Sequence, residues 1–358
     1  MISPTSDGPI VVTGGAGFIG CNIADRVAAQ GSEVIVFDAL ARPGVERNLN
    51  WLVSRHGDRI RPVIADVRDE EALNSAVCGA SAVFHMAAQV AVTTSLLDPL
   101  DDFSVNLLGS LNVLEAVRRG GSVAPVVFAS TNKVYGSLAD ISLEIVDDAY
   151  APKEASVRAR GVDETRPLDF HTPYGCSKGA ADQYVLDYAR SFGLRTCVLR
   201  MSCIYGPRQM GSEDQGWVAH FLIRALEGRP ISIYGDGKQV RDVLHVSDAV
   251  DAYLAALRNI DRVSGRPFNL GGGPANAVSL RQVLAYIETL TGRALELDFD
   301  DWREGDQRYF VADARRLRAA LDLPLPIGWR EGVADLCDWL RTERGLAGPR
   351  ALAKAAAG

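Results

Sequence analysis

A glycine-rich turn between a short apolar segment and a helical segment constrains this chain more than any other feature. Residues 10–13 are predicted to form a buried strand, and Thr13-Gly-Gly-Ala-Gly-Phe-Ile-Gly20 follows before an amphipathic stretch that ends near Gln30. Glycines here allow a tight turn and close approach of the backbone to a pyrophosphate, and the next helix points its amides and dipole at the same anion. Asp38 closes the second apolar segment at the spacing that a dinucleotide site requires. The turn therefore predicts a dinucleotide-binding unit.

Asp38 also favours one dinucleotide over the other. A carboxylate at this position accepts hydrogen bonds from the adenosine ribose hydroxyls and repels a 2′-phosphate, so NAD is expected rather than NADP. Arg42 lies close enough in the sequence to keep NADP as an alternative. Asp66 ends the third apolar segment and has two interpretations, a contact to the adenine edge or an exposed aspartate at a strand end.

Short β-branched segments alternate with longer amphipathic segments over the first two hundred residues. Their near-continuous apolar character is typical of strands that are buried on both faces. The alternation predicts an α/β fold, a Rossmann-type doubly wound parallel sheet. Strands are expected at Ile10–Thr13, Glu33–Phe37, Arg61–Ala65, Ala82–Met86, Pro125–Ala129 and Arg195–Met201, and helices at Phe18–Gln30, Glu70–Val77, Phe103–Arg119 and Tyr174–Phe192.

The pattern changes after about residue 201, where Gly- and Pro-rich turns separate shorter segments. We expect a dinucleotide-binding domain over residues 1–200, to which the chain could return around 236–275, and a smaller C-terminal substrate-binding region over residues 201–358. Residues 137–171 form a long polar connection. Three roles are open for it, namely a wall or lid over the substrate pocket, a structural insertion, or an oligomer contact.

Composition excludes several classes of function. The net charge of −7 argues against nucleic acid or an anionic membrane surface as the main partner. No apolar run approaches the roughly 20 residues of a membrane span. Met1–Gly8 lack the basic and apolar parts of a signal peptide, and the six cysteines show no paired spacing, so a reduced cytoplasmic protein is expected. No cluster of His, Cys and Asp has metal-ligand spacing, so no metal is expected.

Tyr174 and Lys178 are one helical turn apart on a helix predicted to begin at Thr172-Pro173. A free phenol has a pKa near 10, but a nearby ammonium and an oxidised nicotinamide ring both favour the phenolate and make it a usable base. The pair alone is common by chance. Thr131 strengthens it, because this residue follows the fifth predicted strand at the edge where such sheets bind ligands. Its hydroxyl could bind the substrate oxygen that Tyr174 deprotonates, or it could only cap the strand end.

Taken together, these motifs resemble the extended short-chain dehydrogenase/reductase superfamily, in its NAD-dependent nucleotide-sugar epimerase/dehydratase branch. The resemblance runs from Gly14 to about Leu340. It rests on the glycine turn, Ser130–Gly136, Tyr174–Lys178, Tyr205-Gly-Pro207, and Arg241-Asp-Val243 leading to His245–Asp248. Segments 130–136, 168–184, 214–218, 237–245 and 303–308 are most similar to the CDP-paratose 2-epimerases, also called CDP-tyvelose epimerases.

The resemblance implies a tightly bound NAD and assigns candidate residues to it. The cofactor-contacting set is Gly14, Gly17, Phe18, Ile19, Gly20, Asp38, Asp66, Val67, Ala87, Tyr174 and Lys178. Lys178 would also hold the nicotinamide ribose, and Thr131 would aid proton handling. His85 is expected to be a packed residue at a strand end rather than a base. A homodimer or homotetramer is implied as well.

Substrate contacts follow from the same resemblance. Arg241 and Arg303 match positions that contact the diphosphate of a nucleotide sugar, and a guanidinium suits phosphate oxygens. Gln89 and Lys133 are further candidates, with Lys133 equally interpretable as a surface lysine at a strand end. Cys203 stands where many relatives carry Asn, which puts one usual substrate contact in doubt.

The implied activity is that of an isomerase, which inverts C2 of a CDP-activated deoxyhexose such as CDP-paratose. Tyr174 would take the hydroxyl proton while hydride passes to NAD, and the same hydride would return to the other face of the planar ketone. Dehydratases of the branch carry Asp-Glu directly after the catalytic Thr, whereas Asn132 and Lys133 stand here, which argues against dehydration. A 4-epimerase of the UDP-glucose type, an epimerase for another nucleotide sugar and a non-enzymatic NAD-sensing regulator stay open.

Overall fold

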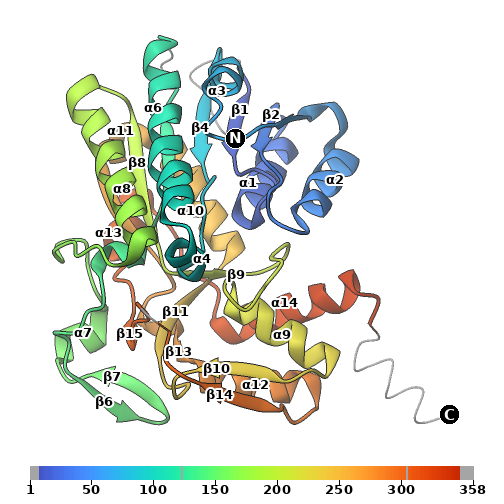
Figure 1. Cartoon of the computed structure of the whole chain (residues 1–358), viewed down its shortest axis with the longest axis vertical. Coiled ribbons are helices and arrows are strands. Elements are labelled where there is room, and N and C mark those ends of the chain that lie inside the picture. Colours follow the sequence, from blue (N-terminus) through green and yellow to red (C-terminus); the bar gives the residue numbers. More distant parts are fainter. Residues whose placement is uncertain (1–7, 122–123, 304, 347–358) are drawn as a thin grey trace.

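Apolar strands line up side by side in the computed structural model, which describes residues 8–121, 124–303 and 305–346. Within these residues they form a seven-stranded parallel sheet in the order β12-β8-β5-β4-β1-β2-β3 (Figure 1). The strands are β1 (Ile10–Thr13), β2 (Val34–Asp38), β3 (Ile60–Ile64), β4 (Ala82–His85), β5 (Val126–Thr131), β8 (Thr196–Met201) and β12 (Arg266–Leu270). The order runs outward from β1 in both directions, which confirms the doubly wound prediction. Ligands bind in such sheets where the strand order reverses.

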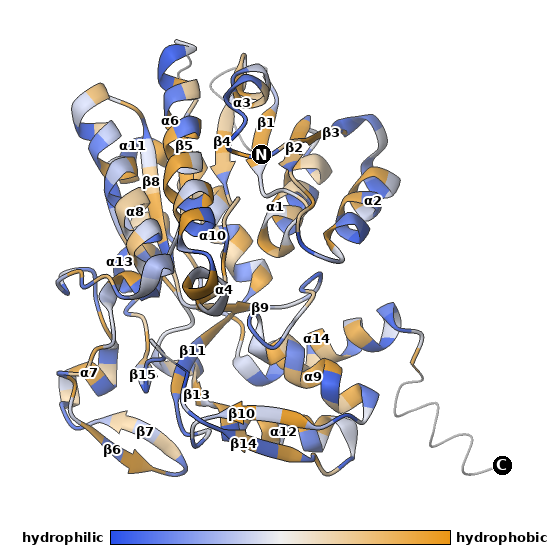
Figure 2. Cartoon of the chain, in the orientation of Figure 1, coloured by the Kyte–Doolittle hydropathy of each residue, from blue (hydrophilic) through white to orange (hydrophobic). Residues whose placement is uncertain are grey.

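Helices cover both faces of this sheet, because alternate side chains of each strand face opposite layers. One face carries α1 (Phe18–Ala29), α2 (Val45–His56), α10 (Val246–Arg258), α11 (Ile260–Val263) and α13 (Arg315–Leu321), and the other carries α3 (Glu70–Val77), α6 (Gly109–Arg119) and α8 (Thr172–Phe192). Val12 and Val36 pack toward α1, whereas Val11 and Phe37 pack toward α3 and α6. Figure 2 shows the apolar colour concentrated on the strands between these layers.

The predicted helix over Phe103–Arg119 is divided in the structure. A helix α5 (Pro99–Phe103) passes through a π-helical turn η2 (Ser104–Leu108) into α6. The wide turn directs the buried Asn106 at a polar network described below, and π-turns of this kind are frequent at functional sites. Gly109 is the first residue of α6. A Cβ there would lie 2.6 Å from Cγ2 of Val67, so this position requires glycine.

The C-terminal half forms a smaller region at the carboxyl edge of the sheet (Figure 1). It contains α9 (Trp217–Glu227), β10 (Ile231–Tyr234), β11 (Val240–His245), α12 (Leu280–Thr291), β14 (Leu297–Asp300) and α14 (Trp329–Glu343). These elements pack around their own apolar core, which includes Leu222, Ile231, Val283 and Leu336. The chain returns to the large sheet through α10 and β12. A domain boundary near residue 200 stays a prediction.

Residues 137–171 are a docked insertion. They contain β6 (Leu143–Val146), β7 (Ala149–Pro152) and α7 (Ala155–Arg160). Apolar side chains of this insertion pack on the outer side of β11, and the Tyr150 hydroxyl donates a hydrogen bond to Asp236 at 2.7 Å. None of its residues lines the large cavity of the molecule. The prediction of a wall or lid is therefore wrong, because the hairpin is held on the far side of the small region.

The remaining elements are short. They are η1 (Gly57–Arg59), α4 (Val92–Leu97), η3 (Asn132–Tyr135), β9 (Cys203–Tyr205), η4 (Pro274–Asn276), β13 (Ala277–Ser279) and β15 (Tyr309–Phe310). β9, β11, β13 and β15 pair in one small sheet, and β10 pairs with β14 in another. Among the described residues, none of the helices has the length and apolarity to cross a membrane.

Candidate active site

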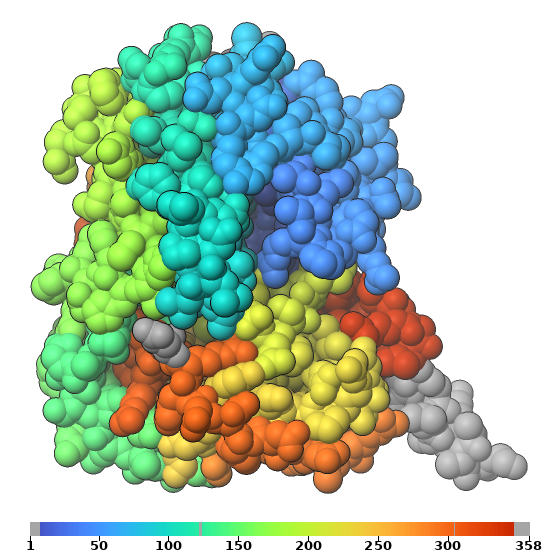
Figure 3. Space-filling model, viewed as in Figure 1, coloured from blue at the N-terminus to red at the C-terminus, as the bar shows by residue number. Residues whose placement is uncertain are grey.

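A cavity of about 850 Å³ lies between the carboxyl edge of the large sheet and the small region. Figure 3 shows the surface hollowed where the blue and cyan N-terminal half meets the yellow segment around α9. Every predicted site residue lines it: Gly14, Gly17, Phe18, Ile19, Gly20, Asp38, Asp66, Val67, Ala87, Gln89, Thr131, Lys133, Tyr174, Lys178, Arg241 and Arg303. The fold thus brings the whole predicted set to one site, while the role of each residue stays a prediction.

The glycine turn shapes one end of the cavity. Gly14 has a φ of 66°, and a Cβ there would lie 2.6 Å from the amide nitrogen of Ala87. A Cβ on Gly20 would lie 2.1 Å from the carbonyl oxygen of Gly14, so only glycine lets α1 approach the strand this closely. α1 begins at Phe18 with no side-chain cap and no acidic residue in its first turn. This helix end therefore fits an anion such as a pyrophosphate.

Two carboxylates stand beside the turn. Asp38 accepts hydrogen bonds from the amides of Ala16 at 2.9 Å and Leu40 at 2.8 Å, which fix the side chain at the end of β2. Asp66 pairs with Arg68 at 2.7 Å, and this hydrogen bond holds the pKa of the carboxyl below its ordinary value. Both residues line the cavity, and these two acceptors fit a dinucleotide whose ribose hydroxyls donate hydrogen bonds. A contact between Asp66 and adenine stays a prediction.

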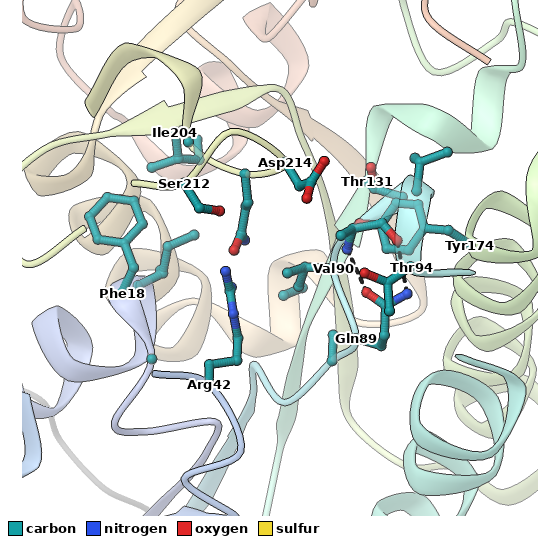
Figure 4. A pocket seen from close by; sticks show the side chains of 18 of the residues that line it. Phe18, Arg42, Gln89, Val90, Thr94, Thr131, Tyr174, Ile204, Ser212 and Asp214 are labelled. Atoms are coloured by element: carbon teal, nitrogen blue, oxygen red, sulfur yellow. Dashed lines mark hydrogen bonds between the residues drawn. The ribbon is translucent and has the colours of Figure 1, made fainter. Parts of the chain in front are cut away.

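Thr131 and Tyr174 meet at the opposite end of the cavity (Figure 4). Thr131 is the last residue of β5, and its side chain lies close enough to the Tyr174 phenol to lower the pKa of that phenol. The same hydroxyl accepts a hydrogen bond from the amide of Lys133 at 3.2 Å, so the strand-end cap is present, while a catalytic role of Thr131 stays a prediction. α8 begins at Thr172-Pro173, which confirms the predicted helix start and puts Lys178 one turn beyond Tyr174.

Burial dominates the electrostatics of this pair. It raises the pKa of Tyr174 to about 12, the Thr131 hydrogen bond lowers that pKa, and the charge of Asp102 raises it. Burial lowers the pKa of Lys178 to about 7, against the opposing charges of Asp182 and Asp102. The Lys178 nitrogen lies 4.2 Å from the ring centre of Phe128, where a cation is favoured. The protein groups by themselves leave the pKa of Tyr174 high, and the expected activation by Lys178 together with an oxidised nicotinamide ring stays a prediction.

A buried carboxylate beside this pair is not among the predicted residues. Asp102 is fully buried and accepts hydrogen bonds from Ser177 at 2.5 Å, Asn106 at 3.0 Å and Gln89 at 3.1 Å. The Gln89 amide also binds both backbone groups of Ala91, so its polar atoms are already occupied within the protein. The spacing of Asp102 and Asn106, four residues apart in a mainly apolar helical segment, is a signal that could have indicated this network.

Cations line the substrate end of the cavity, and each already contacts an oxygen acceptor. Arg241 donates to Asp306 at 2.5 Å, and Arg303 lies 3.4 Å from the carboxylates of both Glu213 and Asp214. Lys133 donates to the carbonyl oxygen of Gly305 at 3.0 Å. A diphosphate that binds here would have to replace these carboxylates. Sequence reasoning did not identify them, because they come from loops far from the cations that they neutralise.

Lys133 is not a surface lysine at a strand end, which was the second interpretation of this residue. Its side chain is 22% exposed, and burial lowers its pKa to about 8. Asn132 beside it donates to Gln307 at 3.0 Å and is also buried. No carboxylate therefore stands at either of the two positions directly after Thr131.

Cys203 accepts a hydrogen bond from the Trp217 indole at 3.5 Å.

His85 is a packed residue, as the sequence predicts. Its ring nitrogens lie 2.6 Å from the hydroxyl of Thr13 and 2.9 Å from that of Ser110. Burial and the nearby Lys178 charge lower its pKa to about 3, so the ring is neutral and held in place. It supports the end of β4 rather than exchanging protons with a ligand.

Comparisons with known proteins agree with this site. The NAD dependent epimerase/dehydratase family matches residues 10–271. The chain is 42% identical to CDP-paratose 2-epimerase of Salmonella typhi over 92% of its own length and 98% of that protein. It is 31% identical to a putative UDP-glucose 4-epimerase of Methanocaldococcus jannaschii, over 93% of its own length and 98% of that protein.

Two solved structures share the fold over nearly the whole chain. The UDP-glucose 4-epimerase of Thermotoga maritima with UDP-glucose has a TM-score of 0.81 and 30% identity, covering 94% of this chain and 99% of that one. The UDP-glucose 4-epimerase of Thermus thermophilus in complex with NAD has a TM-score of 0.77 and 34% identity, covering 93% of this chain and 99% of that one. The cofactor is NAD, and the glycine turn, Asp38 and the start of α1 fit it.

Proposed function

This chain belongs to the NAD dependent epimerase/dehydratase family, and from that premise we propose that it inverts one carbon of a nucleotide sugar. The proposed substrate is a CDP-activated deoxyhexose such as CDP-paratose, inverted at C2. The extent of the similarity to a CDP-paratose 2-epimerase supports this choice. The enzyme would be an isomerase with a permanently bound cofactor.

The residues around Thr131 carry the proposal. A hydrogen-bonded Thr131–Tyr174 pair faces the cavity, which is suited to removing and returning the proton of one sugar hydroxyl. Eliminating water would need a further acid and base beside that pair. The neighbouring Asn132 and Lys133 provide an amide and an amine instead. The geometry therefore favours reversible oxidation over dehydration.

Each side chain has a distinct part in this chemistry. Bound NAD supplies a hydride acceptor that can return the same hydride. Tyr174 accepts the hydroxyl proton and later gives it back. The Thr131 hydroxyl donates a hydrogen bond to the Tyr174 oxygen, which is charged when Tyr174 acts as the base. Lys178 is buried close to the phenol, and the charges of Asp182 and Asp102 partly oppose the lowering of its pKa by burial. Arg241, Arg303 and Lys133 would then bind the diphosphate.

A panel of nucleotide sugars tests the substrate and the position. Purified enzyme is incubated with CDP-paratose, CDP-glucose, UDP-glucose and dTDP-glucose, and the products are resolved by proton NMR. We expect a C2 epimer from the CDP sugar and none when Tyr174→Phe is used. A C4 epimer of UDP-glucose would instead establish a 4-epimerase activity, for which two of the similar proteins are named. A 4-keto-6-deoxy sugar would contradict the argument from Asn132 and Lys133.

The NAD-sensing alternative is tested by the same panel. A sensor would bind NAD but convert none of the four nucleotide sugars. The presence of Thr131, Tyr174 and Lys178 in one cavity argues for turnover.

A cytoplasmic location stays a prediction from the sequence.

We propose that two copies pair through an exposed apolar surface on α4, α5 and α8. Leu97 is 86% exposed and Leu100 is 80% exposed, and Phe103, Tyr184 and Phe192 are exposed as well. These helices contact one another. Light scattering should give two or four times the chain mass of 38.5 kDa, and a Leu97→Asp, Leu100→Asp variant should shift toward the monomer. A monomeric wild-type protein would contradict the proposal.

A further inference from the structure

Arg42 is a cation of the cavity that the reaction described above does not use. It lies on the turn between β2 and α2, and it lines the cavity at the dinucleotide end. Figure 4 shows its guanidinium reaching into the space beside Phe18, on the side away from Thr131 and Tyr174. Phe18 is the first residue of α1, the helix whose open end fits a pyrophosphate.

The other cationic side chains around the cavity already have carboxylate partners or neighbours. Arg68 pairs with Asp66 and Asp101, Arg241 and Lys133 share Asp306, Arg303 faces Glu213 and Asp214, and Lys178 has Asp182 and Asp102 nearby. Arg42 differs from all of these. Its side chain has no hydrogen bond, ion pair or ring contact within the part of the chain that the structure describes.

The nearest carboxylate in the sequence does not serve as its partner. Both carboxylate oxygens of Asp38 accept hydrogen bonds from backbone amides, those of Ala16 and Leu40. Arg42 is an exposed residue of the cavity wall, and no carboxylate charge acts on its pKa. A guanidinium with no acceptor of its own can bind an anion without first breaking an ion pair, and phosphate oxygens match its donors in geometry and charge.

The turn that carries Arg42 is held in place. Asn48 of α2 is buried and donates hydrogen bonds to the carbonyl oxygens of Ala16 at 3.1 Å and Arg208 at 3.2 Å. These bonds connect α2 to the glycine turn and to the segment on the opposite wall. Gly44 has a φ of 91°, and a Cβ there would lie 3.3 Å from Cγ of Met210. The guanidinium is thus presented from a fixed backbone.

We propose that Arg42 binds the pyrophosphate of the bound dinucleotide, facing the amides at the start of α1 from the other side. The two together form one anion site, with backbone donors on one wall and a guanidinium on the other. The site accounts for tight retention of the cofactor through successive turnovers. The proposal depends on NAD binding and not on the identity of the sugar, so it can be tested even where the proposed epimerisation fails.

The test compares Arg42→Ala and Arg42→Lys with Arg47→Ala. Arg47 is an exposed residue of α2 that does not line the cavity, so its removal makes the same charge change away from the site. The readouts are the NAD content of the purified protein and, after the cofactor is stripped, the Kd values for NAD and NADP by calorimetry. Thermal unfolding checks that each variant is folded.

Arg42→Ala should lose bound NAD and raise the Kd for NAD about 10- to 100-fold, the range expected for a charged hydrogen bond. The Kd for NADP should rise by the same factor, Arg42→Lys should fall between, and Arg47→Ala should match the wild type. An unchanged Kd for NAD would overturn the proposal. A loss confined to NADP would assign the guanidinium to the 2′-phosphate, and a rise only in the substrate KM would assign it to the sugar diphosphate. Either result would also overturn it.

Discussion

Replacing Thr131 by Val removes the hydroxyl and every interaction that it makes, including the hydrogen bond to Asn132 at 3.4 Å. Valine has nearly the same shape and keeps the β-branch suited to the last residue of β5, so little packing is lost. The variant loses the cap on the Lys133 amide, whose bond measures 3.2 Å. A lost cap of this kind costs about 1 kcal/mol of folding stability. It also loses the hydrogen bond to the Tyr174 phenol.

The second loss sets the effect on catalysis. A hydrogen bond to a charged group contributes about 1.5–3 kcal/mol, and the charged group here is the Tyr174 phenolate, whose population falls when that bond is lost. The expected fall in kcat is therefore about 10- to 150-fold, at 1.4 kcal/mol for each factor of ten. The Thr131 hydrogen bond lowers the pKa of Tyr174, so its removal raises that pKa. Since the phenolate is the active base, the acid limb of kcat/KM should move to higher pH.

The assay is the pH dependence of kcat and kcat/KM for the wild type, Thr131→Val and Thr131→Ser, from about pH 6 to pH 10. Serine keeps the hydroxyl and should retain most of the activity and the wild-type acid limb. A Thr131→Val enzyme with wild-type kcat and an unmoved acid limb would refute the assignment of Thr131. Loss of kcat in both variants without a shift of the limb would point to packing instead.

Three further substitutions test other parts of the account. Tyr174→Phe should lower kcat at least about 1000-fold with bound NAD unchanged, because the base is removed while the helix is retained; NAD content and single-turnover assays measure this. Lys133 has a pKa of about 8, so kcat/KM for the nucleotide sugar should fall as pH rises above 8 and the ammonium is lost. The Lys133→Met variant should have a low kcat/KM at every pH, without the fall above pH 8. Asp182→Asn breaks a buried pair with Arg200, whose side chains are 0% and 3% exposed, and should cost about 3–5 kcal/mol in urea unfolding.

Much of the fold and site follows from local patterns in the sequence. The apolar strands and the glycine turn depend on neighbours in the chain, so the parallel sheet and the start of α1 are predictable. Parallel strands end at one edge, which brings residues after different strands, such as Asp38 and Thr131, to one cavity. The rule accounts for the predicted site residues that follow strands of the large sheet, but not for Arg241 and Arg303, which come from the small region.

The rest depends on contacts between distant segments. The docking of residues 137–171 is decided by partners such as Asp236, which no local pattern indicates. The pairing of Arg303 with Glu213 joins loops 90 residues apart. The buried Asp102 looks like an ordinary acidic helix residue until the π-turn and α8 enclose it. The spacing of Tyr174 and Lys178 also does not reveal that burial raises the pKa of the phenol.

The most direct test of the central claim is proton NMR of the purified enzyme with CDP-paratose in deuterated water, with no NAD added. The account predicts inverted coupling at C2 with no deuterium at that carbon, because a hydride removed and returned inside the cavity does not exchange with solvent. It also predicts that the bound NAD content is unchanged at the end of the reaction. Deuterium at C2 would contradict the account and show that the carbon loses a proton to solvent instead.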